Sequence, residues 1–209
     1  FFIFFRNDSS KSFPWINFGR KLYILHAVAV FGIMASLLIC IHGHFFEYKY
    51  VWEHTSKSLP VYYQFSAMWS GQEGSTLLWM FWHGVLGCVL IFKAKDWESP
   101  VLSIVALAQV LLGSMLLGIY FFGYKLGSNP FALMRDTMDI PVFKMNPDWI
   151  PEDGTGLNPS LQNYWMVIHP PTLFLGFAAC TIPAAFAIAS LWQRNFTDWV
   201  KPVLPWSLF

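Results

Sequence analysis

The sequence predicts an all-α integral membrane protein, a polytopic helical bundle with long external loops. Of its 209 residues, 56% are hydrophobic and only 12% are charged, whereas about 25% are charged in a typical soluble domain. Four apolar runs are long enough, or nearly so, to cross about 30 Å of hydrocarbon. The formal net charge of +1 supplies no strong positive field, so we expect no nucleic acid partner.

The apolar runs contain no aspartate, glutamate, lysine or arginine except at or near their ends. They therefore predict membrane helices over residues 20–46, 75–92, 100–124 and 170–192. We expect residues 1–19 to hold the end of an upstream helix and a cytoplasmic loop. Residues 193–209 are expected to form a cytoplasmic segment that leads to a further helix.

The basic residues are divided unequally between the two sets of connections. Residues 6–21, 93–99 and 193–209 carry eight lysines and arginines, whereas the longer set at 47–74 and 125–169 carries five. The positive-inside rule therefore places the first set in the cytoplasm and the second set outside. A loop as long as the second external one suggests function or docking.

A carboxylate stands just before the second predicted span, in the stretch WSGQEGS. Ser70 and Glu73 have the spacing of a capping box, in which each side chain bonds a backbone N–H of the first helical turn. Capping alone would fully explain why Glu73 stands at this position. The alternative explanation keeps the cap and adds a binding site, in which Gly71 and Gly74 let a ligand or partner approach the backbone closely. Trp69 precedes the predicted helix, so it is the tryptophan most expected to face an external ligand.

The stretch HPP opens the last predicted span. Proline is tolerated in a first helical turn, where its missing N–H would have no partner. Pro170 and Pro171 therefore predict His169 at the helix cap, outside the membrane, where the helix dipole disfavours imidazolium. A neutral imidazole there is either a metal ligand or a simple cap. Asn158 begins a turn shortly before this stretch.

The remaining histidines give weaker signals. His26 and His83 lie roughly 7 Å and roughly 14 Å above the inner membrane edge, at about 1.5 Å per residue. Two nitrogens on one haem iron lie only about 4 Å apart, so hydrogen bonds between helices are favoured over a shared haem. Three cysteines form no C-x-x-C motif, which excludes a dithiol or c-type haem attachment site in this chain.

At these residues the sequence resembles the CcmF family of cytochrome c maturation proteins, within the haem-handling superfamily that includes CcmC and CcsA. The matching segments follow one another in the family's order. They are WSGQEGSTLLW (69–79), SNPF (128–131), DGTGLNPSLQ (153–162), HPPTLFLGF (169–177) and IPAAFAIASL (182–191). The sequence departs from the family at Ser70, where glycine is common, and in an extra acidic stretch near residues 135–150.

The resemblance implies a haem lyase (synthase) component for c-type cytochromes, with no catalytic residue in this chain. Such a protein receives haem from a haem chaperone and presents it for thioether attachment to apocytochrome c, alongside other cytochrome c maturation subunits. His169 matches the first of two external histidines that bind the haem iron. The residues of the WSGQEGS and HPP motifs, with Asn158, would support this site.

The second external histidine, the tryptophan-rich haem platform and the pair that binds a membrane haem b lie downstream in the family. A membrane haem b is therefore expected only in the full-length protein, and the haem b handled outside is in transit. The resemblance implies a multi-pass protein in the lipid of a bacterial cytoplasmic (inner) membrane, rather than an organelle inner membrane. The alternatives are a quinol-linked membrane b-type cytochrome or transporter subunit, using His26 and His83, and a purely structural scaffold.

Overall fold

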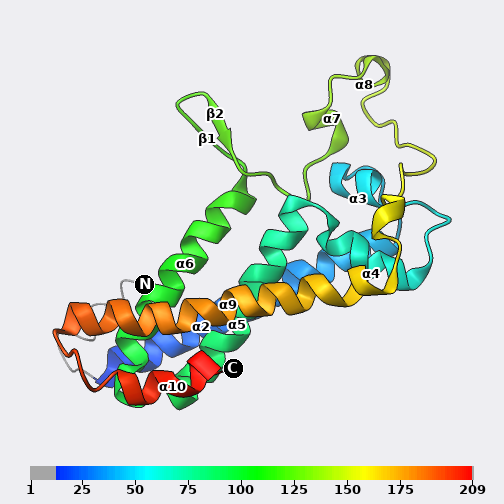
Figure 1. Cartoon of the computed structure of the whole chain (residues 1–209). Helices are drawn as coiled ribbons and strands as arrows, with labels where there is room; N and C mark the ends of the chain where they lie inside the picture. Colours follow the sequence, from blue (N-terminus) through cyan, green and yellow to red (C-terminus); the bar gives the residue numbers. More distant parts are fainter. Residues whose placement is uncertain (1–12, 209) are drawn as a thin grey trace. The chain divides into compact units, whose positions relative to one another are not determined.

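The structure is a computed structural model that describes residues 13–208. Its long helices are α2 (Phe13–His42), α5 (Gln72–Lys93), α6 (Glu98–Leu117) and α9 (Tyr164–Gln193), drawn in Figure 1. These four helices are long and apolar enough to cross a membrane. The prediction of a helical membrane protein is confirmed.

Shorter elements fill the connections between the long helices. They are α3 (Lys49–His54), α4 (Val61–Ser70), η1 (Lys95–Trp97), β1 (Ile119–Phe121), β2 (Tyr124–Leu126), α7 (Met134–Thr137), α8 (Pro141–Met145), η2 (Pro159–Leu161) and α10 (Val200–Leu208). The two segments expected to be external loops therefore contain several helices. The upstream helix end expected within residues 1–12 lies outside the described residues.

The long helices differ from the predicted spans at their ends. The span predicted over 20–46 begins at Phe13 and ends at His42. The span predicted over 100–124 ends at Leu117, because Gly118 adopts a left-handed conformation with φ +61°. The span predicted to begin at residue 170 begins at Tyr164.

A β-hairpin replaces the predicted end of the third span. Strands β1 and β2 pair antiparallel, with Ile119 opposite Leu126 and Phe121 opposite Tyr124. Phe122 and Gly123 between them both have positive φ, +48° and +84°. Two residues with positive φ form the tight turn whose twist matches that of paired strands.

The chain divides into two compact units. The first comprises the described residues up to Phe31, together with Trp79–Gly113 and the residues from Leu173 onward. In its core, small and branched residues of α9 pack with the apolar face of α6, which includes Val101 and Val105. Alanines allow helices to approach closely. The buried residues of α9 in this core lie along one face of the helix, at i, i+4, i+7, i+8 and i+11: Ala178, Ile182, Ala185, Phe186 and Ala189.

An ion pair joins α2 to the start of α6 within the first unit. Arg20 donates two hydrogen bonds to Glu98, each 2.6 Å long, one to each carboxylate oxygen. The Glu98 residue is only 2% exposed. This two-bond geometry is the strongest form of an arginine–carboxylate contact.

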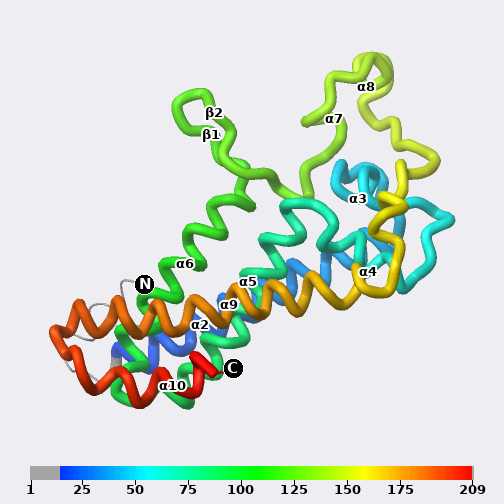
Figure 2. Tube along the Cα trace, in the orientation of Figure 1, coloured from blue at the N-terminus to red at the C-terminus, as the bar shows by residue number. Residues whose placement is uncertain are grey.

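The second unit comprises Gly32–Leu78 and Ser114–Thr172, so it contains both segments expected to be external. Figure 2 follows the yellow trace of the longer segment past the cyan trace of α3. Backbone hydrogen bonds join the two segments. They run from Lys49 N–H to the Ala132 carbonyl (3.0 Å), Met134 to Glu47 (2.9 Å), Thr155 to Trp52 (2.8 Å) and Gly156 to Thr55 (3.1 Å).

Candidate functional site

Tyr50 organises the WSGQEGS stretch. Its side chain is buried in the second unit, and its hydroxyl donates to the Met68 carbonyl at 2.9 Å and accepts from the Gly71 N–H at 3.2 Å. The His54 ring stacks on it, with ring centroids 4.3 Å apart. Burial raises the pKa of Tyr50 above its ordinary value, so the hydroxyl remains a neutral donor at physiological pH.

The capping box predicted for Ser70 and Glu73 is wrong. Ser70 is the last residue of α4, and its hydroxyl donates to the Ala67 carbonyl at 2.9 Å. Gly71 separates α4 from α5, and its carbonyl accepts the first hydrogen bond of α5 from the Ser75 N–H at 3.0 Å. Glu73 is the second residue of α5, where a carboxylate is stabilised by the helix dipole.

The two glycines of the stretch are approached closely by the chain itself. A Cβ at Gly74 would lie 1.7 Å from the Met68 carbonyl oxygen and 2.4 Å from the Tyr50 hydroxyl. A Cβ at Gly71 would lie 2.7 Å from the Tyr50 ring. The space expected for a ligand or partner beside these glycines is therefore filled by Tyr50 and Met68.

Glu73 lines a small polar cavity of about 280 Å³ in the second unit. Lys49 and Lys125 line the same cavity, as do Glu53 and Asp136. Within residues 13–208, no group donates a hydrogen bond to the half-buried Glu73 carboxylate. The cavity therefore offers charges of both signs and a free acceptor, which suits a polar group.

One hydrogen bond joins the WSGQEGS stretch to the helical turn that precedes HPP. Pro170 has no N–H, so the carbonyl of Met166, four residues earlier in α9, lacks its helical donor. The indole N–H of Trp69 donates to this carbonyl at 3.2 Å. Trp69 thus compensates for the proline and fixes α4 against the start of α9.

This contact predicts a specific coupling between two substitutions. Trp69→Phe should lower the free energy of unfolding by about 1 kcal/mol, the contribution of a typical hydrogen bond. In a Pro170→Ala background the new Ala N–H can bond to Met166, so the cost of Trp69→Phe should shrink. Chemical unfolding of the four proteins measures this difference.

Trp165→Phe is a matched control for that experiment, since the Trp165 side chain is 70% exposed. Its cost should be the same with and without Pro170. Equal costs of Trp69→Phe in the two backgrounds would show that the hydrogen bond is energetically unimportant.

The structure places His169 inside α9, so the prediction that it caps the helix is wrong. The helix begins at Tyr164, and the Asn163 side chain accepts from the Met166 N–H at 3.2 Å as its cap. Pro170 and Pro171 accordingly lie at the end of the second turn. His169 is exposed.

Both ring nitrogens of His169 are available for a ligand, because no group within residues 13–208 hydrogen-bonds to them. No hydrogen bond joins His169 to Glu73 in that part of the chain. Nor do three histidine, cysteine or acidic side chains gather there in a group able to hold a metal ion. His169 therefore offers one unengaged imidazole, a side chain that can bind a metal ion through a ring nitrogen.

Asn158 has a local structural role. Its side chain accepts hydrogen bonds from the backbone N–H and the hydroxyl of Ser160, at 3.0 and 2.9 Å, and so caps η2. Tyr63 of α4 donates to the Gln162 carbonyl at 2.7 Å. This turn therefore holds the chain that leads into α9.

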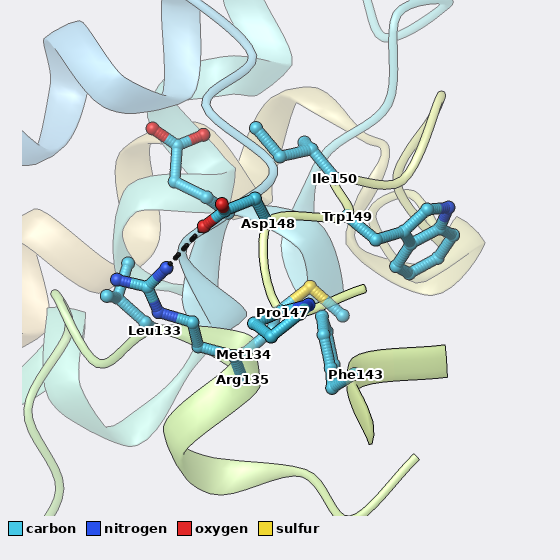
Figure 3. A pocket seen from close by; sticks show the side chains of 9 residues that line it. Leu133, Met134, Arg135, Phe143, Pro147, Asp148, Trp149 and Ile150 are labelled. Atoms are coloured by element: carbon cyan, nitrogen blue, oxygen red, sulfur yellow. Dashed lines mark hydrogen bonds and ion pairs between the residues drawn. The ribbon is translucent and has the colours of Figure 1, made fainter. Parts of the chain in front are cut away.

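The acidic stretch near residues 135–150 forms a second cavity, shown in Figure 3, of about 230 Å³. Arg135 and Asp148 point toward each other across it, with a hydrogen-bonded ion pair of 3.0 Å. Phe143 and Trp149 pack edge to face, with centroids 5.8 Å apart. Arg135 and Asp148 are thus already paired, and Glu47 is the third charged residue of the lining.

The two histidines of the first unit, His26 and His83, differ in their hydrogen bonding. His83 is 1% exposed; its Nδ1 lies 3.1 Å from the Trp79 carbonyl and its Nε2 lies 3.0 Å from the Thr181 hydroxyl of α9. Both nitrogens are therefore engaged, and the favoured interpretation of a hydrogen bond between helices is confirmed for His83. Among residues 13–208, the buried Nε2 of His26 has no hydrogen-bond partner.

Sequence reasoning did not identify Tyr50 or Asn163. Gly71 and Gly74 indicate that something approaches the backbone, but nothing near Tyr50 identifies it as the group that does so. Asn163 is a good helix-capping residue by type, and its position before an apolar run was an available signal.

Comparisons with known proteins agree with the arrangement of these motifs. A family model described as "Cytochrome C assembly protein" matches residues 69–207. The cytochrome c-type biogenesis protein CcmF of Haemophilus influenzae is 32% identical over 202 residues, which cover 91% of this chain and 28% of that protein. CcmF of Pseudomonas fluorescens is 35% identical over 167 residues, covering 78% of this chain and 22% of that protein.

A solved structure with the same fold is that of "Cytochrome c Heme Lyase CcmF", with a TM-score of 0.74 and 22% identity. The match covers 99% of this chain and 30% of that one. The chain thus spans less than a third of the length of these relatives.

Proposed function

The chain belongs to the cytochrome c assembly protein family, and we propose that it is part of a membrane haem lyase component of c-type cytochrome biogenesis. In this role the external face receives haem and presents it for thioether attachment to apocytochrome c. The observation that supports this most directly is the exposed imidazole of His169, held beside two prolines in a helix that Trp69 fixes to the WSGQEGS stretch.

Each residue of the site has a positioning role in this proposal. His169 would bind the iron through a ring nitrogen, and its helix is kept in place by the hydrogen bond from Trp69 and the turn capped by Asn158. Glu73 would orient a polar group of an incoming partner from its cavity. Bound haem supplies the vinyl groups to which the thiols of the apocytochrome add. The chain therefore has to position the haem and the apocytochrome, and it needs no catalytic residue of its own.

The two segments that carry the site face away from the cytoplasm in this role. Residues 47–74 and 125–169 lie outside a bacterial cytoplasmic membrane, as the distribution of basic residues indicates. The partners are a haem chaperone, apocytochrome c and other cytochrome c maturation subunits. A membrane haem b and the second external ligand are supplied by parts of the full-length protein outside this chain.

The alternative of a b-type cytochrome that uses His26 and His83 has less support. Iron ligation by His83 would require it to give up a hydrogen bond, because both of its nitrogens are engaged. Breaking such a bond inside a membrane helix bundle leaves a buried polar group unsatisfied.

Depletion of the protein in its source cell tests the proposed function. Covalently bound haem in c-type cytochromes, measured by haem staining after denaturing electrophoresis, should fall to background. Spectroscopically measured b-type cytochromes should remain near their normal level. A loss of b-type haem with intact c-type cytochromes would favour the alternative and contradict the proposal.

Glu73→Gln tests whether the carboxylate acts through the site. Glutamine keeps the size of the side chain but removes its charge, so the protein level should be unchanged while cytochrome c maturation falls several-fold. Glu53→Gln, in the same cavity, is the control, because Glu53 already pairs with Lys49 at 3.6 Å. Normal maturation with Glu73→Gln would leave the carboxylate without a role in the site.

A further inference from the structure

A cavity of about 880 Å³ lies in the first unit, where α5 ends and the chain turns toward α6. One wall comes from the last turns of α5, another from the turn at residues 94–97, and a third from α10. Lys95 in the turn has φ +51°, an uncommon conformation for a residue other than glycine. It belongs to the lining of the cavity.

Three lysines line this cavity: Lys93, Lys95 and Lys201. None of them forms an ion pair with a carboxylate within residues 13–208. Asp96 and Asp198 are the acidic residues of the lining, so its formal charge is +1. Asp198 also accepts a hydrogen bond from the Asn195 side chain at 2.9 Å, which uses part of its capacity to bind a cation.

The apolar part of the lining extends along α5, toward the part of the helix that would lie in the membrane. Leu86 and Val89 precede Lys93 by seven and four positions, so these three residues lie along one face of α5. Since α5 is long and apolar enough to cross a membrane and ends at Lys93, we expect the two apolar residues to lie within the hydrocarbon and the lysine at its edge. Trp206 on α10 also lines the cavity, and tryptophan is enriched at this depth.

We propose that this cavity binds an anionic phospholipid, with its phosphate among the three lysines and an acyl chain along Leu86 and Val89. The charge of −1 on such a headgroup balances the +1 of the lining. Basic pockets beside membrane helices bind anionic headgroups in this way. The site is separate from His169 and does not depend on the proposed haem function.

The backbone of α10 favours a headgroup that carries hydroxyl groups. Pro205 lies inside α10 and has no N–H, so the Lys201 carbonyl, four residues earlier, lacks its helical donor. A glycerol headgroup can donate a hydroxyl hydrogen bond to this carbonyl. Phosphatidylglycerol is therefore the expected ligand, and the neutral phosphatidylcholine is expected to bind poorly.

The test compares phosphatidylglycerol with phosphatidylcholine of identical acyl chains, titrated into the intact protein in detergent and followed by native mass spectrometry. The wild type should bind phosphatidylglycerol with a preference that the combined change Lys93→Gln, Lys95→Gln, Lys201→Gln lowers roughly tenfold or more, since each lysine near an anionic headgroup contributes. Each single change should produce a smaller loss in the same direction.

The matched control removes the same charge elsewhere, by Lys21→Gln, Lys57→Gln and Lys144→Gln, none of which lines the cavity. It should keep the preference of the wild type. Thermal unfolding without added lipid checks that both triple variants are folded. Equal losses in the two variants would attribute binding to net charge. The absence of any preference for phosphatidylglycerol in the wild type would show that the cavity does not select an anionic headgroup. Either result overturns the proposal.

Discussion

His169→Gly in the intact protein is expected to abolish cytochrome c maturation and to be partly rescued by added imidazole. The ring of His169 is exposed and free of hydrogen bonds within residues 13–208, so removing it breaks no contact that holds the fold there. In the proposed site this ring would bind the haem iron, and a small imidazole can occupy the space that glycine leaves. Haem staining of c-type cytochromes measures both the loss and the rescue.

Ile168→Gly is the control for the helix itself. Glycine in a helix interior costs about 1 kcal/mol relative to alanine at either position, and the Ile168 side chain, 41% exposed, offers no metal ligand. Imidazole should therefore not improve maturation in this variant. Undiminished maturation with His169→Ala would rule out the proposed ligand.

The existence of the long helices could be predicted from the sequence because a single physical requirement decides it. A segment that crosses hydrocarbon must be apolar over its whole length, and four runs meet this requirement. The ends of the helices are less determined. Residues 119–122 are as apolar as the helix before them, so only the glycines at 118 and 123 indicate the turn to a hairpin.

The position of His169 could not be predicted because it depends on a contact between distant residues. Two consecutive prolines normally favour the first helical turn, since further along they leave carbonyls without donors. The structure supplies one of the missing donors from Trp69, 97 positions from Met166 in the sequence. Local sequence patterns contain no information about such a donor. The capping residue Asn163, in contrast, is a local signal for the true start of α9.

The roles of the site residues were likewise predictable where they depend on local sequence and not where they depend on distant contacts. The predicted motif residues all lie in the second unit, where Trp69 donates a hydrogen bond to the carbonyl of Met166, three residues before His169. The central residue of this arrangement, Tyr50, lies in a helix of six residues that gives no periodic signal. Its importance follows only from what its ring and hydroxyl touch.

The contact between Tyr50 and the glycines predicts that Gly74→Ala destabilises the second unit by about 3 kcal/mol, the upper range for overpacking. The new Cβ would lie 1.7 Å from the Met68 carbonyl oxygen. This is a backbone atom, so no change of rotamer can relieve the clash and the start of α5 must move. Thermal unfolding of the purified protein and its level in the membrane measure the effect.

Gly176→Ala is the matched control, because a Cβ at Gly176 in α9 would have no atom within 4 Å. Alanine there should be neutral or stabilise the helix by up to about 1 kcal/mol. The second close atom, the Tyr50 hydroxyl, allows a further distinction: Tyr50→Phe combined with Gly74→Ala should not restore stability, since the Met68 carbonyl remains. Recovery of stability in that double variant would show that the Tyr50 hydroxyl, and not the Met68 carbonyl, sets the requirement for glycine. Stability equal to that of the wild type in Gly74→Ala alone would contradict the close packing of α5 on α4.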